Sequence, residues 1–310
     1  MDETSYLTQL TIRLYQGLQR LPADLRARHA HYLLGSQAGD GGWPGREGGS
    51  DLYYTAFGLR GLMVLDVLTP EICVKAAGFL SRSLAQQASV VDFFSLLYAW
   101  MLVQLGGGPD VLADSPPDWQ ARVVALLQSF RTPDGGYAKT PGGSSGSTYY
   151  TFMVALCYEI LAKDVPGPEA VARFVRSRQR DDGGFVEIAP MKRSGTNPTA
   201  AAVGLLQMLP GADFSAAEAE RVAAFLAEMP SFEGGLRANG RAPLADLLST
   251  FTGAWTLDRL GALGRLDREP MEEFILSVEQ PAGGFRGGLW DERSDVEYTF
   301  YGVGAVALLS

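Results

Sequence analysis

Two kinds of helical segment alternate along the chain. One kind is apolar on nearly every side, as in residues 57–67 and 200–208, whereas the other is amphipathic, as in residues 216–229, where Val222 and Glu228 share one helix. A helix that is apolar all round is buried, and an amphipathic helix keeps one side in water. The pattern therefore predicts pairs made of one buried helix and one outer helix.

A Gly-Gly-aromatic unit recurs five times in step with these pairs. Its second glycine stands at positions 42, 136, 184, 235 and 284, and Leu236 takes the aromatic place in the fourth copy. The last three intervals are 48, 51 and 49 residues, and the first, of 94, indicates a sixth unit without glycines. Since one repeat of this size cannot bury its apolar face alone, neighbouring repeats must stack. We expect an all-α fold, an α/α toroid of six helix pairs that fills residues 1–310 as a single domain.

Each predicted buried helix has a recurring start. In five of the six copies threonine stands at position five, and at position one Asp51 and Asp246 can accept the free N–H groups of the first turn. The first residues of these starts are Asp51, Asp92, Ser147, Gly195, Asp246 and Asp295. The outer partners of four pairs are expected at residues 70–84, 116–128, 168–178 and 216–229. Because equivalent loops precede all buried helices, these helices run parallel and their positive amino ends meet at one mouth.

Composition narrows the function classes without naming one. A 46% apolar fraction is enough for a large core, and the net charge of −9 disfavours nucleic-acid binding. No run approaches ~20 consecutive apolar residues, so no membrane span is expected, and the amino terminus lacks a secretory-signal pattern. Cys73 and Cys157 lie in apolar helical segments, which favours buried free thiols over a disulfide. We expect the protein to be cytoplasmic.

Basic residues gather in the loops before the buried helices. Together with the helix amino ends they would form a rim that favours phosphate groups. They are Arg46, Lys139, Lys192, Arg193, Arg237, Arg241, Arg286 and Arg293. Acidic residues such as Glu47 and Glu187 share these loops, so a merely polar surface remains the alternative.

Aromatic and polar residues fall at positions three and four of the helix starts, or about a turn deeper, where they would face the toroid axis. The candidates for contact with a ligand are Tyr53, Tyr54, Tyr149, Tyr150, Asn197, Trp255, Tyr298 and Tyr301. An aromatic wall suits an apolar chain and can stabilise a cation. The alternative is that these rings pack the axis solid.

The Gly-Gly-aromatic loop followed by an Asp-x-x-x-Thr helix start resembles the repeat of protein prenyltransferase β subunits and of squalene and oxidosqualene cyclases. The resemblance extends over essentially the whole chain, whose size is similar to that of the prenyltransferase β subunit. It implies an isoprenoid diphosphate or polyprene substrate and, for a β subunit, a helical-repeat partner; a homodimer is the other possibility.

The resemblance also places a zinc site, at positions that Asp246, Leu248 and Tyr298 occupy here. Zinc needs several N, S or O donors, normally four, so zinc is not expected, and Mg²⁺ on the diphosphate is the metal that stays possible. His29 and His31 lie two apart on the predicted first helix, face different sides, and are interpreted as surface or packing residues.

The candidate chemistry rests on the same resemblance. Cyclases carry their acid in an Asp-x-Asp-Asp-Thr helix start, and Asp295 and Glu297 come nearest to it here, whereas Asp246 keeps only the first aspartate. Arg237 and Arg241 occupy the loop where prenyltransferases meet the diphosphate. Two interpretations of Glu297 stay open: a buried acid with a raised pKa, or a solvated residue that favours the helix amino end.

Three functions are therefore compatible with the sequence. The first is an enzyme, like a prenyltransferase or a terpene cyclase, that acts on an isoprenoid diphosphate without zinc. The alternatives are a non-catalytic isoprenoid carrier and a protein-interaction scaffold.

Overall fold

The structure is a computed structural model, and it describes residues 5–84, 89–212 and 214–310. Helix α1 is Tyr6–Leu18. The helices with mostly buried side chains are α3 (Leu52–Val64), α5 (Val90–Leu105), α7 (Thr148–Ile160), α9 (Thr196–Met208), α11 (Leu247–Arg259) and α13 (Val296–Leu309). The helices that alternate with them are α2 (Ala23–Gly35), α4 (Pro70–Ser83), α6 (Trp119–Ser129), α8 (Pro168–Arg176), α10 (Ala216–Ala227) and α12 (Arg268–Val278). A 3₁₀ turn, η1, spans Leu263–Arg265.

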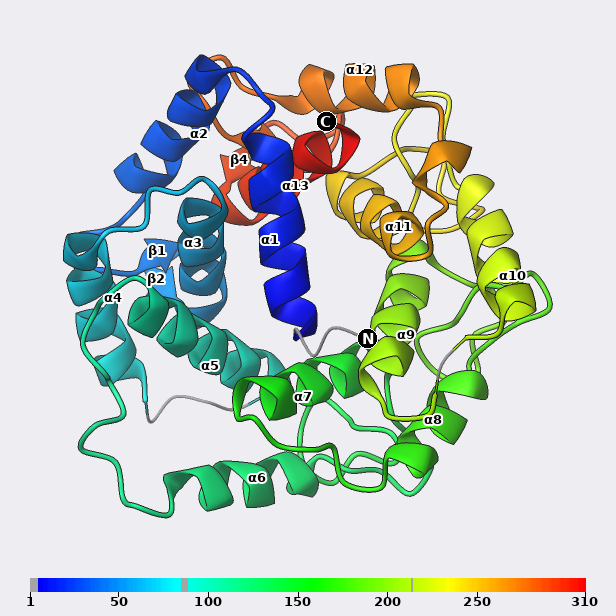
Figure 1. Cartoon of the computed structure of the whole chain (residues 1–310), viewed down its shortest axis with the longest axis horizontal. Coiled ribbons are helices and arrows are strands. Elements are labelled where there is room, and N and C mark those ends of the chain that lie inside the picture. Colours follow the sequence, from blue (N-terminus) through cyan, green and yellow to red (C-terminus); the bar gives the residue numbers. More distant parts are fainter. Residues whose placement is uncertain (1–4, 85–88, 213) are drawn as a thin grey trace. The chain divides into compact units, whose positions relative to one another are not determined.

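Two compact units make up the chain (Figure 1). The first unit comprises residues 1–122 and 278–310, so that the last helix, α13, packs against α1 and α3 near the beginning of the chain. In the same unit α5 packs against α3 and α4. The second unit comprises residues 123–277, in which α9 packs against both α7 and α11. The predicted alternation of buried and amphipathic helices is confirmed in both units.

The predicted starts of the buried helices are confirmed with one exception. The side chains of Asp51, Ser147, Asp246 and Asp295 each accept a backbone N–H of the first turn, and Gly195 stands at the cap position of α9 without a side-chain bond. The prediction that Asp92 opens the second repeat is wrong. Helix α5 begins at Val90, its cap is Ser89, and Asp92 accepts the Ser89 N–H at 2.9 Å to complete a capping box.

The Gly-Gly pair is needed because its backbone packs closely against the next outer helix. In the third repeat Gly135 has φ +92°, a conformation that glycine adopts easily. A Cβ on Gly136 would lie 2.5 Å from the ring of Phe174 on α8, so only glycine fits. The second glycines of the other four copies face Phe79, Phe225, Phe274 and Tyr32 in the same way. The recurring motif therefore joins each loop to the helix that packs beside it.

The threonine at position five explains how each loop is joined to its buried helix. Its hydroxyl accepts the N–H of the residue after the glycine pair, at distances between 2.9 and 3.2 Å in all five copies. The pairs are Trp43 with Thr55, Tyr137 with Thr151, Phe185 with Thr199, Leu236 with Thr250, and Phe285 with Thr299. A buried N–H without an acceptor is costly, so this threonine is structural.

Two antiparallel hairpins complete loops of this kind in the first unit. Strand β1 (Trp43–Pro44) pairs with β2 (Ser50–Asp51), and β3 (Phe285–Arg286) pairs with β4 (Ser294–Asp295). Each hairpin delivers the chain directly to the first residue of a buried helix, α3 or α13. The backbone geometry of the loop thus fixes where these helices begin.

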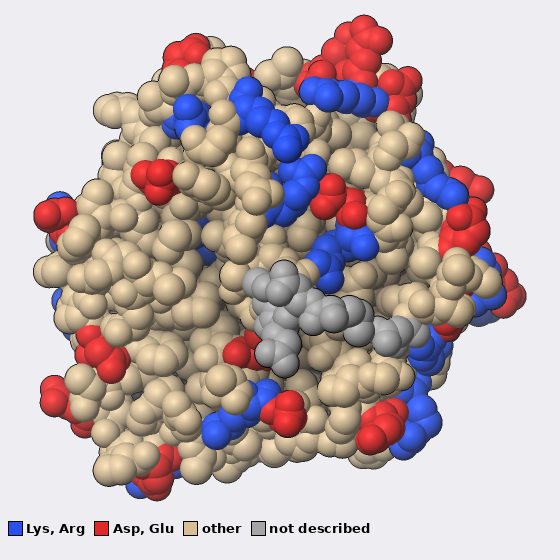
Figure 2. Space-filling view, viewed as in Figure 1, with Lys and Arg blue, Asp and Glu red and all other residues tan. Residues whose placement is uncertain are grey.

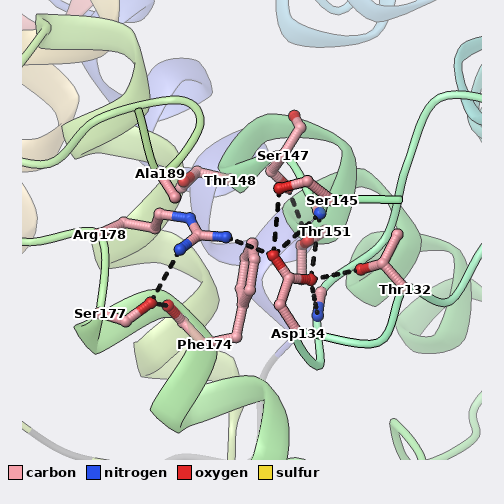
Figure 3. A network of polar contacts seen from close by, with 12 residues as sticks. Thr132, Asp134, Ser145, Ser147, Thr148, Thr151, Phe174, Ser177, Arg178 and Ala189 are labelled. Carbon is pink, nitrogen blue, oxygen red and sulfur yellow. Dashed lines mark hydrogen bonds and ion pairs between the residues drawn. The ribbon is translucent and has the colours of Figure 1, made fainter. Parts of the chain in front are cut away.

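The acidic residue before the glycine pair ties the two ends of its loop together. Figure 3 shows Asp134 at the centre of such a network, where it accepts hydrogen bonds from Thr132 Oγ1 at 2.6 Å and from the Gly146 N–H at 3.1 Å. Its other oxygen lies 2.6 Å from Nη2 of the buried Arg178, which stacks on Phe174. Burial alone would raise the pKa of Asp134, but these bonds and the Arg178 charge hold it below its usual value. The polar network is therefore part of the framework.

Helix α1 lies outside the predicted pairs and closes the carboxyl end of α13. Arg13 donates to the carbonyl oxygens of Ala307 at 3.1 Å and Leu308 at 2.9 Å, and Arg20 donates to that of Ser310 at 3.0 Å. Cations at a helix carboxyl end are favourable because the last carbonyl groups carry partial negative charge.

Candidate functional site at the amino end of helix α13

Asp295 positions the site by capping α13. Its Oδ1 accepts the Tyr298 N–H at 2.8 Å, and its Oδ2 lies 2.6 Å from Arg46 Nε. The same Arg46 pairs through both Nη atoms with Asp291, at 2.9 and 2.6 Å, and stacks 5.2 Å from the Tyr298 ring. Both carboxylates are nearly inaccessible, with 6% of each residue exposed. The loops before α3 and α13 are thus held together by one arginine.

Glu297, two residues further along, is the titratable group of the site. Its Oε1 accepts a hydrogen bond from the Tyr53 hydroxyl of α3 at 2.6 Å. Burial raises the pKa of Glu297 to about 7, and the charge of Asp295 adds to the rise, while Tyr53, Arg46 and Arg60 oppose it. The residue remains partly accessible. A carboxyl group of this kind can donate or accept a proton near neutral pH.

A series of aromatic rings in contact continues from Tyr53, which is hydrogen-bonded to this carboxyl group. Tyr53 makes edge contacts with Tyr54, at 5.4 Å between ring centroids, and with Phe57, at 5.0 Å. Phe57 in turn lies 5.3 Å from Tyr301, whose ring is 6.3 Å from that of Tyr298. The first unit therefore brings together six of the predicted residues: Glu297, Asp295, Tyr53, Tyr54, Tyr298 and Tyr301.

The other predicted residues lie in the second unit. Asp246 caps α11, and its carboxylate accepts hydrogen bonds from the N–H of Ser249 at 2.7 Å and from the Ser249 hydroxyl at 2.8 Å. Burial raises the pKa of Asp246. Asn197 Oδ1 accepts a hydrogen bond from Thr252 at 2.7 Å. These contacts join α9 to α11 and give Asp246 a structural role at its helix end.

The basic loop of the second unit is only partly available to a ligand. Arg237 donates to the carbonyl oxygens of Met229 at 3.2 Å and Glu228 at 2.9 Å, at the end of α10. Arg241 is exposed. Lys139, Lys192 and Arg193 are also exposed, whereas Arg46 of the first unit is bound by carboxylates.

Two aromatic groups were also predicted in the second unit. The ring centroids of Tyr149 and Tyr150, at the start of α7, are 5.6 Å apart, and 38% of Tyr149 is exposed. Trp255 is buried, with Arg259 stacked 5.6 Å from its ring. Glu187 accepts hydrogen bonds from Ser147 and from the Tyr149 N–H, and burial raises its pKa.

His29 has a role that the sequence did not reveal. It lies on α2, is fully buried, and its Nδ1 accepts the Gly284 N–H at 3.2 Å. In three other repeats an aspartate before the glycine pair accepts this N–H, but the sixth repeat has Ala282 there. The His29 Nε2 lies 3.0 Å from Glu279 Oε1. His31 is exposed, so the two histidines do face different sides.

The residues that the structure describes offer neither a cluster of metal ligands nor a membrane-spanning helix. Among the residues that the structure describes, no three His, Cys, Asp or Glu side chains are grouped as metal ligands. Every helix in the described ranges is too short or too polar to cross a bilayer. The buried, free state of Cys73 and Cys157 is confirmed. Figure 2 shows Lys and Arg interspersed with Asp and Glu on one face of the molecule, without a broad area of one sign.

Comparison with known proteins assigns the family. A family model described as the prenyltransferase alpha-alpha toroid domain matches residues 72–310. The chain belongs to this family. The all-α toroid fold that the repeat predicted is thereby confirmed, and the resemblance to prenyltransferases holds.

Particular members of the family show how far the similarity extends. The chain is 28% identical over 221 residues to the β subunit of geranylgeranyl transferase type-2 from Saccharomyces cerevisiae, over 69% of this chain and 66% of that protein, so it spans about two thirds of the relative's length. The Candida albicans protein geranylgeranyltransferase-I complexed with GGPP has a TM-score of 0.69 at 13% identity, over 92% and 91% of the two chains. A variant of the type II terpene cyclase MstE from Scytonema, bound to geranylgeranyl dihydroxybenzoate, has a TM-score of 0.58 at 17% identity, over 98% of each chain. At these identities the two structures show a shared fold.

Proposed function

We propose that the protein binds an isoprenoid diphosphate and that Glu297 acts as the proton acceptor in transfer of its prenyl group. The observation that carries the proposal is the partly accessible Glu297 with a pKa of about 7, bonded to Tyr53, whose ring contacts Phe57 and through it Tyr301. A base of this pKa is half ionised at neutral pH, which suits general acid–base catalysis. The family relatives whose names refer to geranylgeranyl groups support an isoprenoid ligand.

The reaction needs no electron transfer. An acceptor O–H or S–H loses its proton to the Glu297 carboxylate, a bond forms between the acceptor atom and C1 of the prenyl chain, and the C1–O bond to diphosphate breaks. Tyr53, Tyr54 and Tyr298 of the first unit would contact the prenyl chain, and Mg²⁺ would act only on the diphosphate.

The test is calorimetric titration with geranylgeranyl diphosphate combined with an assay for released diphosphate in the presence of candidate acceptors. We expect Glu297→Gln to keep binding but to lower release by about 100-fold or more, the usual contribution of a general base. Glu187→Gln removes another carboxyl group with a raised pKa and should leave release unchanged.

Each alternative has its own outcome. Binding without turnover by the unmodified protein, with and without added Mg²⁺ or Zn²⁺, would favour the isoprenoid carrier. Absence of binding would leave the protein-interaction scaffold, and turnover that depends on zinc would contradict the proposal.

A further inference from the structure

Arg60 is an arginine on buried helix α3 that the proposed reaction does not use. Its guanidinium carbon lies 4.0 Å from the ring centroid of Phe300, 4.6 Å from Phe57 and 5.2 Å from Tyr98. These rings come from α13, α3 and α5, all in the first unit. Stacking on three rings fixes the plane of the guanidinium and the direction of its N–H groups.

The donors of Arg60 are not used by the protein. Among the residues that the structure describes, none forms a hydrogen bond or ion pair with its guanidinium, and the buried Nε has no acceptor. The contrast with Arg46 is clear, because that arginine makes three bonds to two carboxylates. A guanidinium has five N–H donors and no acceptor, and leaving them unpaired in apolar surroundings is unfavourable.

Arg60 lines a narrow crevice in the first unit. The crevice is too narrow for a water molecule, and Leu10, Leu14, Met63 and Leu102 contribute to its walls. The residue as a whole is nevertheless partly accessible, while its Nε is not. The Nη end is therefore the part that a ligand can reach.

The charge of Arg60 decides which ligand suits this aromatic group. Three rings around one point would favour a carbocation in a neutral wall, but here a permanent cation already occupies that point. A second cation beside it is repelled, whereas a carboxylate or phosphate can accept paired hydrogen bonds from the planar guanidinium. Arg60 also helps to lower the pKa of Glu297, so its field reaches the proposed proton acceptor.

We propose that Arg60 is the recognition residue of an oxyanion subsite in the first unit. If the proposed function holds, on which this assignment of the ligand rests, the oxyanion is the diphosphate of the isoprenoid or the carboxylate of an acidic acceptor. Arg60 then binds the anion on its Nη groups while Phe57, Tyr98 and Phe300 hold the guanidinium in place.

The experiment is calorimetric titration of the full chain with inorganic pyrophosphate in one arm and benzoate in the other. We expect one of the two to bind, and Arg60→Met to weaken it about tenfold or more, because a paired, charge-assisted contact is lost. Arg60→Lys keeps the charge without the planar donors and should fall between. Arg259→Met is the matched control, since Arg259 also stacks on an aromatic ring but is bonded to Gln207; its binding should be unchanged.

The outcomes separate this inference from the proposed function. Equal binding by the unmodified protein and by Arg60→Met and Arg60→Lys, each shown to be folded by its melting temperature, would overturn the subsite. Failure of the unmodified protein to bind either anion would overturn it too. Binding of geranylgeranyl diphosphate that is insensitive to Arg60, together with pyrophosphate and benzoate binding that is also insensitive to Arg60, contradicts the subsite alone. Arg60-dependent anion binding without any isoprenoid binding supports the subsite and contradicts the proposed function.

Discussion

Helices α11 and α13 start in the same way and yet carry different chemistry. Each begins after a Gly-Gly loop, each is capped by an aspartate, Asp246 or Asp295, and each has a threonine at position five that accepts the loop N–H. These shared residues hold the backbone. They account for the repeat as a fold signal and leave positions three and four to vary.

The two helix starts differ in the partners of the aspartate and in the residue at position three. Asp246 is satisfied locally by Ser249, and Leu248 is at position three. Asp295 is bonded by Arg46, which is 249 residues away in sequence, and position three is Glu297. Chemistry at a repeat is thus determined by partners from other parts of the chain, which a single repeat does not specify.

The largest expected effect on stability comes from removing Arg46, which bonds the capping aspartate of α13. Arg46→Met leaves Asp291 and Asp295 buried without their cation, and removal of one partner of a buried pair typically costs about 3–5 kcal/mol. We expect a loss of this size in the free energy of urea unfolding. Asp246→Ala, at a capping aspartate that is bonded, within the described ranges, by Ser249 and not by an arginine, should cost about 1 kcal/mol. A loss below about 1 kcal/mol for Arg46→Met would mean that the pair behaves like an exposed salt bridge.

The loop before α13 should also make the first unit sensitive to acid. Burial lowers the pKa of His29 from 6.5 to about 4, against the neighbouring charge of Glu279. The unfolded chain binds this proton first, so stability is full above pH 6.5 and is lost as the pH falls towards 4, by about 3 kcal/mol. The free energy of unfolding in urea, measured at about pH 7 and at about pH 4.5, checks this, because most of the loss falls between these two pH values.

The matched variant for this prediction is His29→Gln. It keeps an acceptor near the Gly284 N–H but cannot titrate, so its stability should fall less between the two pH values. An equal fall in both proteins would place the acid sensitivity elsewhere.

The elements of the fold could be predicted from the sequence because their causes are local. Capping by Asp51, Ser147 and Asp295 depends on residues three positions away, and burial of a helix is visible in its own composition. Asp92 shows the limit of this reasoning. It lies where the repeat places a cap, but Ser89 and Asp92 form a capping box that starts the helix earlier.

The candidate site could be predicted only in part. Glu297 and the tyrosines were found from their places in the repeat, but the Tyr53 bond and the pKa of about 7 depend on α3 and α13 packing together. His29 and Arg60 have no signal in the repeat, because His29 bonds Gly284, 255 positions away, and Arg60 stacks on rings from three different helices. The one available indication was the missing aspartate at Ala282, which leaves the Gly284 N–H in need of another acceptor.

The threonines test what the two helix starts share. Thr250→Val and Thr299→Val each leave a buried backbone N–H without its acceptor, at Leu236 and Phe285. Each should lower the free energy of unfolding by about 1–3 kcal/mol, and the two losses should agree to within about 1 kcal/mol. Thr252→Val is the comparison within α11. It removes a hydroxyl that donates to Asn197 and, among the described residues, accepts no loop N–H, so the bonds at Leu236 and Phe285 stay intact. A large loss at only one of the two would show that the repeats are not equivalent.

The smallest effect concerns the acid that distinguishes α13 from α11. Tyr53→Phe removes the hydrogen bond to the Glu297 carboxylate, a bond that lowers its pKa. The pKa should therefore rise from about 7 by up to about one unit, with less than about 1 kcal/mol lost in stability near pH 6. Infrared difference spectra across about pH 5–9 would follow the carboxyl C=O band, which Glu297→Gln identifies by its disappearance. Tyr54→Phe, which changes a ring beside Tyr53, should leave the titration midpoint of Glu297 in place. If the pKa of Glu297 fell in Tyr53→Phe, the Tyr53 hydroxyl would stabilise the protonated acid, and Glu297 would then act as a proton donor.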